Sequence, residues 1–238
     1  MIIMSRPFFY IDVYDGVQSQ VVLNEETSKH VVQVLRMKIG EELNLTDGKG
    51  SLLQCQIVDD NRKQCRVVIK SKTENAKPDK QITIAISLLK NTNRFEWFLE
   101  KATEIGVTEI IPLLCERTEK EKFRFERLNG ICISAMLQSQ QTWLPLLSEP
   151  VEYKKWIGKL TPGQKLIAHC ENEQTRQLLS TALLLSVDPL ICIGPEGDFT
   201  PAEITMALDN GFIPVSLGET RLRTETAGVV AATLLKLT

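Results

Sequence analysis

The chain has 238 residues, 43% hydrophobic and 24% charged, which is the composition of an ordinary globular protein. This supply of apolar side chains is enough for one large core or two smaller ones. The formal net charge of −2 is not that of a dedicated nucleic-acid binder, because phosphate neutralisation draws on an excess of Lys and Arg. Any nucleic-acid footprint must therefore come from local clustering of basic residues in three dimensions.

Three features of the sequence bear on metal binding and on the cellular compartment: the cysteines, the histidines and the N-terminus. None of the six cysteines forms a C-x-x-C pair and only two histidines are present, which argues against zinc or another bound metal. The first ten residues lack a basic start followed by a long apolar stretch, and no run approaches 18 apolar residues. We therefore expect a cytoplasmic protein with reduced thiols, no signal peptide and no membrane span.

Residues 1–72 predict a small domain built from short strands. A turn signal, Asp-Gly-Lys-Gly over residues 47–50, separates two of them, and one helix is expected over Ser28–Met37. Several short strands with few helices suggest a small barrel. The polar, proline-containing stretch 73–80 predicts a linker. The expected strands are Gln20–Leu23, Glu42–Leu45, Ser51–Val58 and Gln64–Lys70.

Residues 81–238 alternate strand-like and helix-like patterns, which predicts an α/β layered domain with a mostly parallel sheet. The helix expected from Thr200 has clear ends, with a capping residue, a proline in the first turn and Gly211 after the last turn. The expected strands are Gln81–Leu89, Glu109–Leu114, Lys165–His169, Pro189–Ile193 and Pro214–Leu217. The expected helices are Arg94–Ile105, Phe123–Gln140, Glu173–Leu185, Thr200–Asn210 and Glu225–Leu235.

Two polar loops, Ile193–Phe199 and Leu217–Ala227, each join a predicted strand to a predicted helix. In open α/β sheets, ligands bind outside the carboxyl ends of strands, so these loops are candidate binding segments. The simpler interpretations are a turn that needs Gly and Pro only for its shape and a solvated charged loop capped by Thr224. Neither loop has the dinucleotide fingerprint or the phosphate-loop pattern, which disfavours a nucleoside triphosphate site.

Three other polar features have an ordinary structural explanation. Arg94 lies near the start of a predicted helix whose charged residues form a solvated face with i,i+4 pairs. His169 ends a predicted strand, and a lone histidine is more often structural than catalytic. His30, with Arg36 and Lys38, could face phosphate, although a solvated surface is the simpler interpretation.

Taken together, four stretches resemble the RsmE-type uridine-N3 methyltransferases of 16S ribosomal RNA, in the SPOUT superfamily. The likeness spans nearly the whole chain, and its last two stretches are the most specific. In chain order the stretches are His30 with Val34–Lys38 and Asp47–Gly50; Lys90 with Arg94, Glu96–Trp97 and Lys101–Val107; Gly194–Gly197; and Leu217–Gly218 with Leu222–Ala227.

This resemblance implies a fold, a reaction and partners. It implies a PUA-like RNA-binding barrel over residues 1–72 and a methyltransferase domain with a deep trefoil knot over residues 81–238. The residues alone predict an unknotted doubly wound sheet, because true knots are nearly absent from folds. It also implies a homodimer that binds S-adenosylmethionine in the knot loops and methylates N3 of a specific uridine in 16S ribosomal RNA of the small subunit.

The resemblance also implies roles for residues of this chain. Arg223 is the first catalytic candidate and Arg94 the second, because fixed positive charge would favour the N3-deprotonated uracil. Glu225 could orient Arg223 or accept the proton. The implied cofactor-binding residues are Leu88, His169, Ile193, Gly194, Pro195, Glu196, Gly197, Leu217, Gly218, Leu222 and Thr224. The implied RNA-binding residues are His30, Arg36, Lys38, Arg94, Gln138 and Ser139.

The chain departs from the family pattern at three places. Position 198 is Asp where the family usually has Gly, which adds a charge near the expected pocket. Position 220 is Thr where many members have Arg, although Arg221 follows it. The family's Glu-Gln-Ser-Gly-Arg stretch is here Leu137–Gln141, so Gln141 replaces an arginine expected to serve RNA or the active site.

Three alternatives remain open on the sequence alone. One is a SPOUT-type methyltransferase acting on ribose, on another base position or on a different RNA. Another is an inactive relative that only binds RNA. The third is an unrelated α/β enzyme for a small nucleotide, which the lack of a phosphate loop disfavours.

Overall fold

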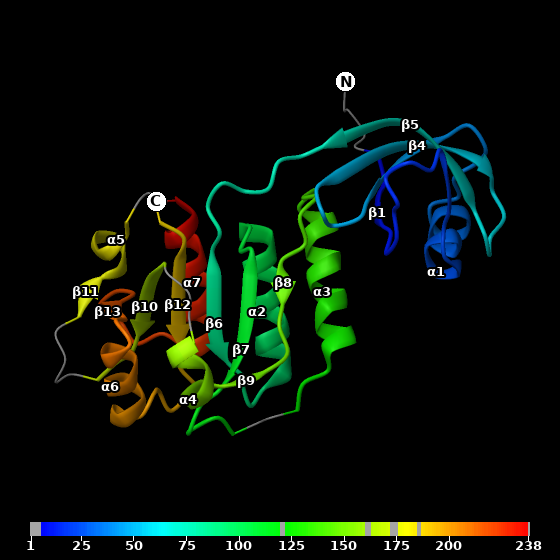
Figure 1. Cartoon of the computed structure of the whole chain (residues 1–238). Helices are drawn as coiled ribbons and strands as arrows, with labels where there is room; N and C mark the ends of the chain where they lie inside the picture. Colours follow the sequence, from blue (N-terminus) through cyan, green and yellow to red (C-terminus); the bar gives the residue numbers. More distant parts are fainter. Residues whose placement is uncertain (1–5, 120–121, 160–162, 172–175, 185–186, 238) are drawn as a thin grey trace. The chain divides into compact units, whose positions relative to one another are not determined.

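The computed structural model describes residues 6–119, 122–159, 163–171, 176–184 and 187–237 (Figure 1). By its internal contacts the chain divides into two compact units. The first runs through Lys77 and includes Met136–Leu144, and the second comprises Pro78–Ala135 and the chain from Pro145 onward. The segment Met136–Leu144 therefore groups with strands far from it in the sequence.

The first unit is built on a five-stranded sheet with the order β1-β3-β4-β5-β2. β1 runs parallel to β3, and the other pairs are antiparallel. The four predicted strands are confirmed, but β1 was not predicted, and β5 extends two residues into the predicted linker. The strands are β1 (Phe8–Tyr10), β2 (Gln20–Val22), β3 (Glu42–Thr46), β4 (Ser51–Asp59) and β5 (Arg66–Glu74).

One helical segment covers this sheet, in a place shifted from the prediction. α1 (Glu25–Lys29) begins three residues before the predicted start because the Asn24 side chain accepts a hydrogen bond from the Thr27 N–H at 2.8 Å. It continues as a single π-helical turn, η1 (His30–Val34), and stops before Arg36, whose φ of 58° is left-handed. The core beneath it includes alternate residues of β4, namely Leu53, Cys55 and Ile57.

The second unit contains an eight-stranded sheet whose main path has the order β11-β13-β10-β12-β6-β7-β8, with β9 also on β7. All of these pairs are parallel, which confirms the predicted parallel sheet. The trefoil knot stays a prediction, since strand order does not record how the chain threads. The strands are β6 (Thr83–Ser87), β7 (Glu109–Leu114), β8 (Leu146–Leu147), β9 (Val151–Glu152), β10 (Gln164–Ala168), β11 (Gln177–Leu178), β12 (Pro189–Ile193) and β13 (Ile213–Ser216).

Four of the five helices predicted for this part of the chain are confirmed within a few residues. The helix predicted over Glu173–Leu185 is wrong where the structure describes it, because β11 precedes a helix of only four residues; residues 172–175 and 185 lie outside the described residues. The capping box of α6 forms as predicted. The helical elements are α2 (Thr92–Ile105), α3 (Phe125–Gln138), α4 (Tyr153–Trp156), η2 (Ile157–Lys159), α5 (Leu179–Ala182), α6 (Pro201–Asp209) and α7 (Thr224–Leu237).

Helices cover both faces of this sheet (Figure 1). On one face α7 lies against α2 and β6, and Gly228 permits this approach because a Cβ there would lie 2.6 Å from the Phe98 ring and 2.9 Å from Ile86. On the other face Ala85 packs in a buried cluster with Tyr153 and Ile204. Since both faces are buried, solvent and ligands reach the sheet only at the strand ends. In the described ranges no helix has the length and apolarity that crossing a bilayer requires.

The C-terminal end of α3 explains one departure from the family pattern. The Gln141 N–H donates to Met136 O at 3.0 Å and the Gln140 N–H to Leu137 O at 3.1 Å, which is a Schellman motif. Such a motif needs a left-handed residue, and Gln140 has a φ of 56°. The glycine of the family stretch falls at this position, so the backbone geometry that favours glycine is kept although the glycine is not.

We expect Gln140→Gly to raise the free energy of unfolding by about 0.5–1 kcal/mol, because glycine adopts the left-handed conformation without the steric penalty of a Cβ. Urea denaturation followed by circular dichroism measures this change in the free energy of unfolding. Gln138→Gly is the matched control, since Gln138 is helical and the same change there should lower stability by up to about 1 kcal/mol. If both variants changed the free energy of unfolding in the same direction, the assignment of Gln140 as a strained left-handed residue would be contradicted.

Candidate functional site

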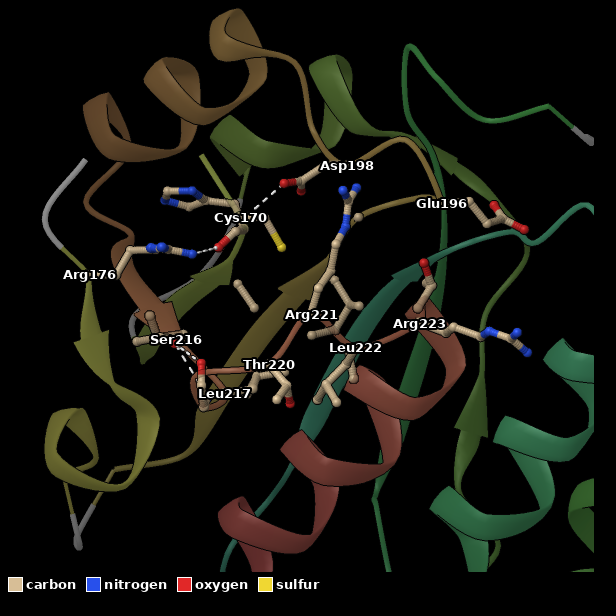
Figure 2. Close-up of a pocket in the computed structure, with 18 of the residues that line it drawn as sticks. Cys170, Arg176, Glu196, Asp198, Ser216, Leu217, Thr220, Arg221, Leu222 and Arg223 are labelled. Carbon is tan, nitrogen blue, oxygen red and sulfur yellow. Dashed lines mark hydrogen bonds between the residues drawn. The ribbon is translucent and has the colours of Figure 1, made fainter. Parts of the chain in front are cut away.

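A cavity of about 580 Å³ opens in the second unit where β10, β12 and β13 end (Figure 2). This volume is in the range of small-molecule and cofactor pockets. Its walls come from the loops that follow these three strands and from the first turn of α7. The predicted site residues that line it are His169, Ile193, Gly194, Pro195, Glu196, Leu217, Gly218, Leu222, Arg223 and Thr224.

The loop after β12 is a tight turn that lines one side of the cavity. A Cβ at Gly194 would lie 3.0 Å from the Phe199 backbone nitrogen, so the turn closes only with a small residue there. The Asp198 N–H donates to Pro195 O at 2.9 Å, and Asp198 has a φ of 63°. This left-handed conformation accounts for the glycine that the family usually has at position 198, and Asp is among the residues that tolerate it.

The Asp198 carboxylate holds two strand-end loops together. It accepts a hydrogen bond from the Cys170 N–H at 2.7 Å (Figure 2). It also accepts one from the Phe199 N–H at 2.8 Å. The first bond ties the end of β10 to the loop after β12. Asp198 therefore adds a negative charge to the cavity wall, as expected from the sequence. Two backbone N–H groups donate to its carboxylate and partly stabilise that charge.

His169 places an unsatisfied imidazole in the cavity wall. The residue is 5% exposed, and neither ring nitrogen has a hydrogen-bond partner in the described chain. Burial lowers the pKa of His169 below its ordinary value of 6.5, with the Asp198 charge opposing this and the Arg176 charge adding to it. The ring is thus neutral at pH 7 and offers one donor and one acceptor to a ligand. Leaving both unpaired would cost about 1–3 kcal/mol for each group.

The loop after β13 forms the opposite wall. The Ser216 hydroxyl donates to Gly218 O at 2.8 Å, which fixes the first bend of this loop. Arg221 and Arg223 are both exposed cavity-lining residues. In Figure 2, Arg221 points toward the loop of Asp198, whereas Arg223 extends away from it. The two guanidinium groups therefore point in different directions.

The other two catalytic candidates lie outside the cavity lining. Arg94 Nε lies 3.6 Å from Glu225 Oε1, and the Glu225 side chain is only 7% exposed. Glu225 Oε2 has no hydrogen-bond partner in the described part of the chain. The pair joins the first turn of α2 to the first turn of α7, directly after Arg223 and Thr224.

Two implied cofactor-binding residues also lie elsewhere. Leu88 lines a second, smaller cavity with residues of α2 and α3. Gly197 accepts a hydrogen bond from Arg117 Nη1 at 2.6 Å and is not part of the lining of the larger cavity.

The implied RNA-binding residues are spread over both units. His30, Arg36 and Lys38 are exposed in the first unit, and the Lys38 ammonium lies 3.7 Å from Asp60. Gln138 ends α3 and Ser139 follows it. Both belong to the first unit, whereas Arg94 belongs to the second.

Several lining residues were missed by the sequence analysis. Those that end or follow strands could have been found from the rule that ligands meet the carboxyl ends of parallel strands. Arg176 gave no such signal, because its segment was predicted as a helix. The lining residues outside any predicted binding segment are Ala168, Cys170, Arg176, Val215 and Ser216. Asp198, Glu219, Thr220, Arg221 and Ala227 lie in the two candidate loops but were given no role in the site.

Comparison with known protein families matches nearly the whole chain. An RNA methyltransferase domain matches residues 75–236, and an RNA methyltransferase PUA domain matches residues 23–70. The chain belongs to this RNA methyltransferase family. The first unit is accordingly PUA-like, as the resemblance implied. No group of three or more His, Cys, Asp or Glu residues suited to a metal ion occurs in the ranges that the structure covers.

Individual relatives agree with the family. Ribosomal RNA small subunit methyltransferase E of Synechocystis is 31% identical over 90% of this chain and 72% of its own length. The crystal structure of a probable rRNA methyltransferase from Porphyromonas gingivalis matches with a TM-score of 0.88 at 41% identity, covering 95% of each chain. The small subunit methyltransferase E of Neisseria gonorrhoeae, solved with S-adenosyl methionine bound, has a TM-score of 0.81 at 30% identity and 95% coverage of each chain.

We expect the lowered pKa of His169 to make stability depend on pH. The unfolded chain takes up a proton at this histidine near pH 6.5 and the folded chain only at lower pH. The contribution of His169 to the free energy of unfolding is therefore constant above about pH 7.5 and falls as the pH drops through 6.5 toward the folded-state pKa. The slope is at most about 1.4 kcal/mol for each pH unit.

Urea denaturation between pH 7.5 and 5.5 measures this dependence. His169→Gln should flatten it, since glutamine does not titrate. His30→Gln, at the only other histidine of the chain, is the matched control. Equal pH profiles for all three proteins would contradict the assignment.

Proposed function

We propose that this protein transfers the methyl group of S-adenosylmethionine to N3 of a specific uridine in 16S ribosomal RNA of the small ribosomal subunit. Membership of the RNA methyltransferase family supports the reaction class. The observation that carries the cofactor assignment is the cavity of about 580 Å³ with an unsatisfied, buried His169 in its wall. The uridine-N3 position rests on the four resembling stretches of sequence.

The cavity lining suits the parts of S-adenosylmethionine. Ile193, Leu217 and Leu222 would supply apolar contacts for the adenine ring. The ring nitrogens of His169 and the backbone amides of the two loops would bond its polar atoms. The N–H groups at the start of α7, beside Thr224, would favour the carboxylate. When bound, S-adenosylmethionine supplies an electrophilic methyl group on a sulfonium sulfur.

Arg223 is the residue best suited to prepare the uracil. Neutral uridine carries a proton on N3, so the protein must favour the deprotonated ring or accept the proton during transfer. Arg223 lines the cavity and is exposed, so its fixed positive charge could stabilise negative charge on the uracil oxygens. Much of the remaining rate would come from alignment of N3 with the methyl carbon.

We propose that Glu225 and Arg94 hold the helix turn that carries Arg223 in place. Since the Glu225 carboxylate is buried and paired with Arg94 at 3.6 Å, we assign it to hold the first turns of α2 and α7 in register. Glu225 Oε2 has no hydrogen-bond partner among the described residues, and Glu225 follows Arg223 by two positions in the chain. Glu225 therefore stays the candidate proton acceptor.

We also propose a cytoplasmic homodimer whose PUA-like unit helps to hold the ribosomal RNA. The support is the resemblance, which implies both. The exposed His30, Arg36 and Lys38 are the candidate phosphate contacts of that unit. The target edge of a paired uridine is hidden, so the base must be unpaired or turned out.

The decisive experiment incubates the protein and S-adenosylmethionine with small ribosomal subunits from cells lacking the gene. We expect one equivalent of 3-methyluridine in 16S ribosomal RNA, located by nuclease digestion and mass spectrometry. A methyl group on ribose or on another base atom would contradict the N3 assignment. Calorimetric binding of S-adenosylmethionine without any transfer would instead indicate an inactive relative.

Arg223→Ala should lower kcat for methyl transfer by about 10²–10³-fold, because a fixed charge at the reacting base is lost. The Kd for S-adenosylmethionine, measured by calorimetry, should stay within a few-fold. Lys236→Ala removes one positive charge from the other end of α7 and serves as the control. Wild-type transfer rates in Arg223→Ala would remove Arg223 from the mechanism.

A further inference from the structure

A second cavity, of about 290 Å³, opens in the second unit beside the carboxyl end of β6. It lies among the segment after β6, the first turn of α2, residues 122–124 and the first turn of α3. Leu88, implied by the resemblance as a cofactor contact, is one of its lining residues. No role assigned above accounts for this cavity.

The base of the cavity is apolar and contains an aromatic ring. Leu89 and Phe95 are each 2% exposed, and Leu128 is also buried, so these side chains are fixed by packing. Phe123 is half-buried and offers a further ring at the cavity wall. A pocket with aromatic walls and this volume suits one planar ring, and base–aromatic stacking is tolerant of base identity.

The rim of the cavity is positively charged. Lys122 and Arg124 are exposed, and neither makes an ion pair with any residue that the structure describes. The single acidic lining residue, Glu96, receives two hydrogen bonds from Arg127, at 2.6 and 2.9 Å. The Arg127 hydrogen bonds lower the pKa of Glu96, so this carboxylate is ionised and its charge is neutralised by Arg127. Lys122 and Arg124 remain as the uncompensated charges.

The two cavities flank one short segment of the chain. The Lys90 N–H, directly after Leu88 and Leu89, donates to Glu196 Oε1 at 3.2 Å, and Glu196 lines the larger cavity. The first turn of α2 also reaches both, since Phe95 lines the smaller cavity while Arg94 pairs with Glu225. A strand of RNA whose target base enters the larger cavity can therefore place an adjacent nucleotide in the smaller one.

We propose that the smaller cavity binds a single unstacked nucleotide of the RNA substrate, next to the methylated uridine. The base lies against Phe123 and the buried apolar residues, and the phosphate lies between Lys122 and Arg124. The two uncompensated cations favour a nucleotide over an apolar segment of a second copy of this chain, which would bury them without partners. This inference rests on the proposed function and adds a subsite to it.

The test compares the full-length protein with Lys122→Ala/Arg124→Ala and with a matched control, Lys155→Ala/Lys236→Ala. Both double variants remove two exposed positive charges, but Lys155 and Lys236 line neither cavity. The substrate is the small subunit lacking the methyl group. Methylation kinetics, equilibrium binding of the subunits and calorimetric binding of S-adenosylmethionine are measured at several salt concentrations.

We expect Lys122→Ala/Arg124→Ala to raise KM and the subunit Kd by about tenfold or more, and to reduce the slope of log Kd against log salt by about one to two. The Kd for S-adenosylmethionine and the kcat should stay within twofold, and the control should match the wild type. Phe123→Ala should likewise raise KM by about tenfold, whereas Phe123→Tyr, which keeps the ring, should restore it.

Equal KM, Kd and salt slope in the Lys122/Arg124 variant and in the control would overturn the proposal. Loss of a dimer in Phe123→Ala, seen by sedimentation, with unchanged RNA affinity would assign the cavity to an interface between copies. Absence of transfer by the wild type would contradict the proposed function instead, while the binding measurements would still decide the subsite.

Discussion

The burial of both faces of the parallel sheet is the constraint on which the binding properties of this protein depend. Ala85 faces α4 and α6 on one side, while Ile86 faces α2 and α7 on the other. Polar groups can meet a ligand only where strands end. Both cavities accordingly lie at carboxyl ends of strands, and the short segment Leu88–Lys90 separates them.

The loops at that edge are held in place by charged side chains bonded to backbone donors. Asp198 joins the end of β10 to the loop after β12, and the fully buried Glu203 accepts from the N–H groups of Glu116 and Thr200. Such charge-assisted bonds are strong and directional. His169, by contrast, has no hydrogen-bond partner for either ring nitrogen among the residues that the structure describes, so both nitrogens are available to a ligand.

Two non-glycine residues show how this chain departs from its family without changing the backbone. Gln140 and Asp198 both have left-handed φ values, 56° and 63°, and both stand where the family pattern has glycine. Asp198 offsets the conformational cost with two hydrogen bonds from its carboxylate, at 2.7 and 2.8 Å. The family's glycines at these positions thus match a left-handed backbone, and at position 198 the hydrogen bonds of the Asp198 side chain accompany the same geometry.

The sequence by itself determined the α/β class, the order of most strands and helices, the capping of α6 and the two loops that wall the larger cavity, because local periodicity and turn residues encode these features. Only the tertiary structure decided that Leu88 belongs to a second cavity, that Arg94 pairs with Glu225, and that Met136–Leu144 groups with the first unit. These depend on contacts between residues far apart in the chain. The short β8, β9 and β11 escaped prediction for the same reason, since a strand of two residues is defined by its partner rather than by its own pattern.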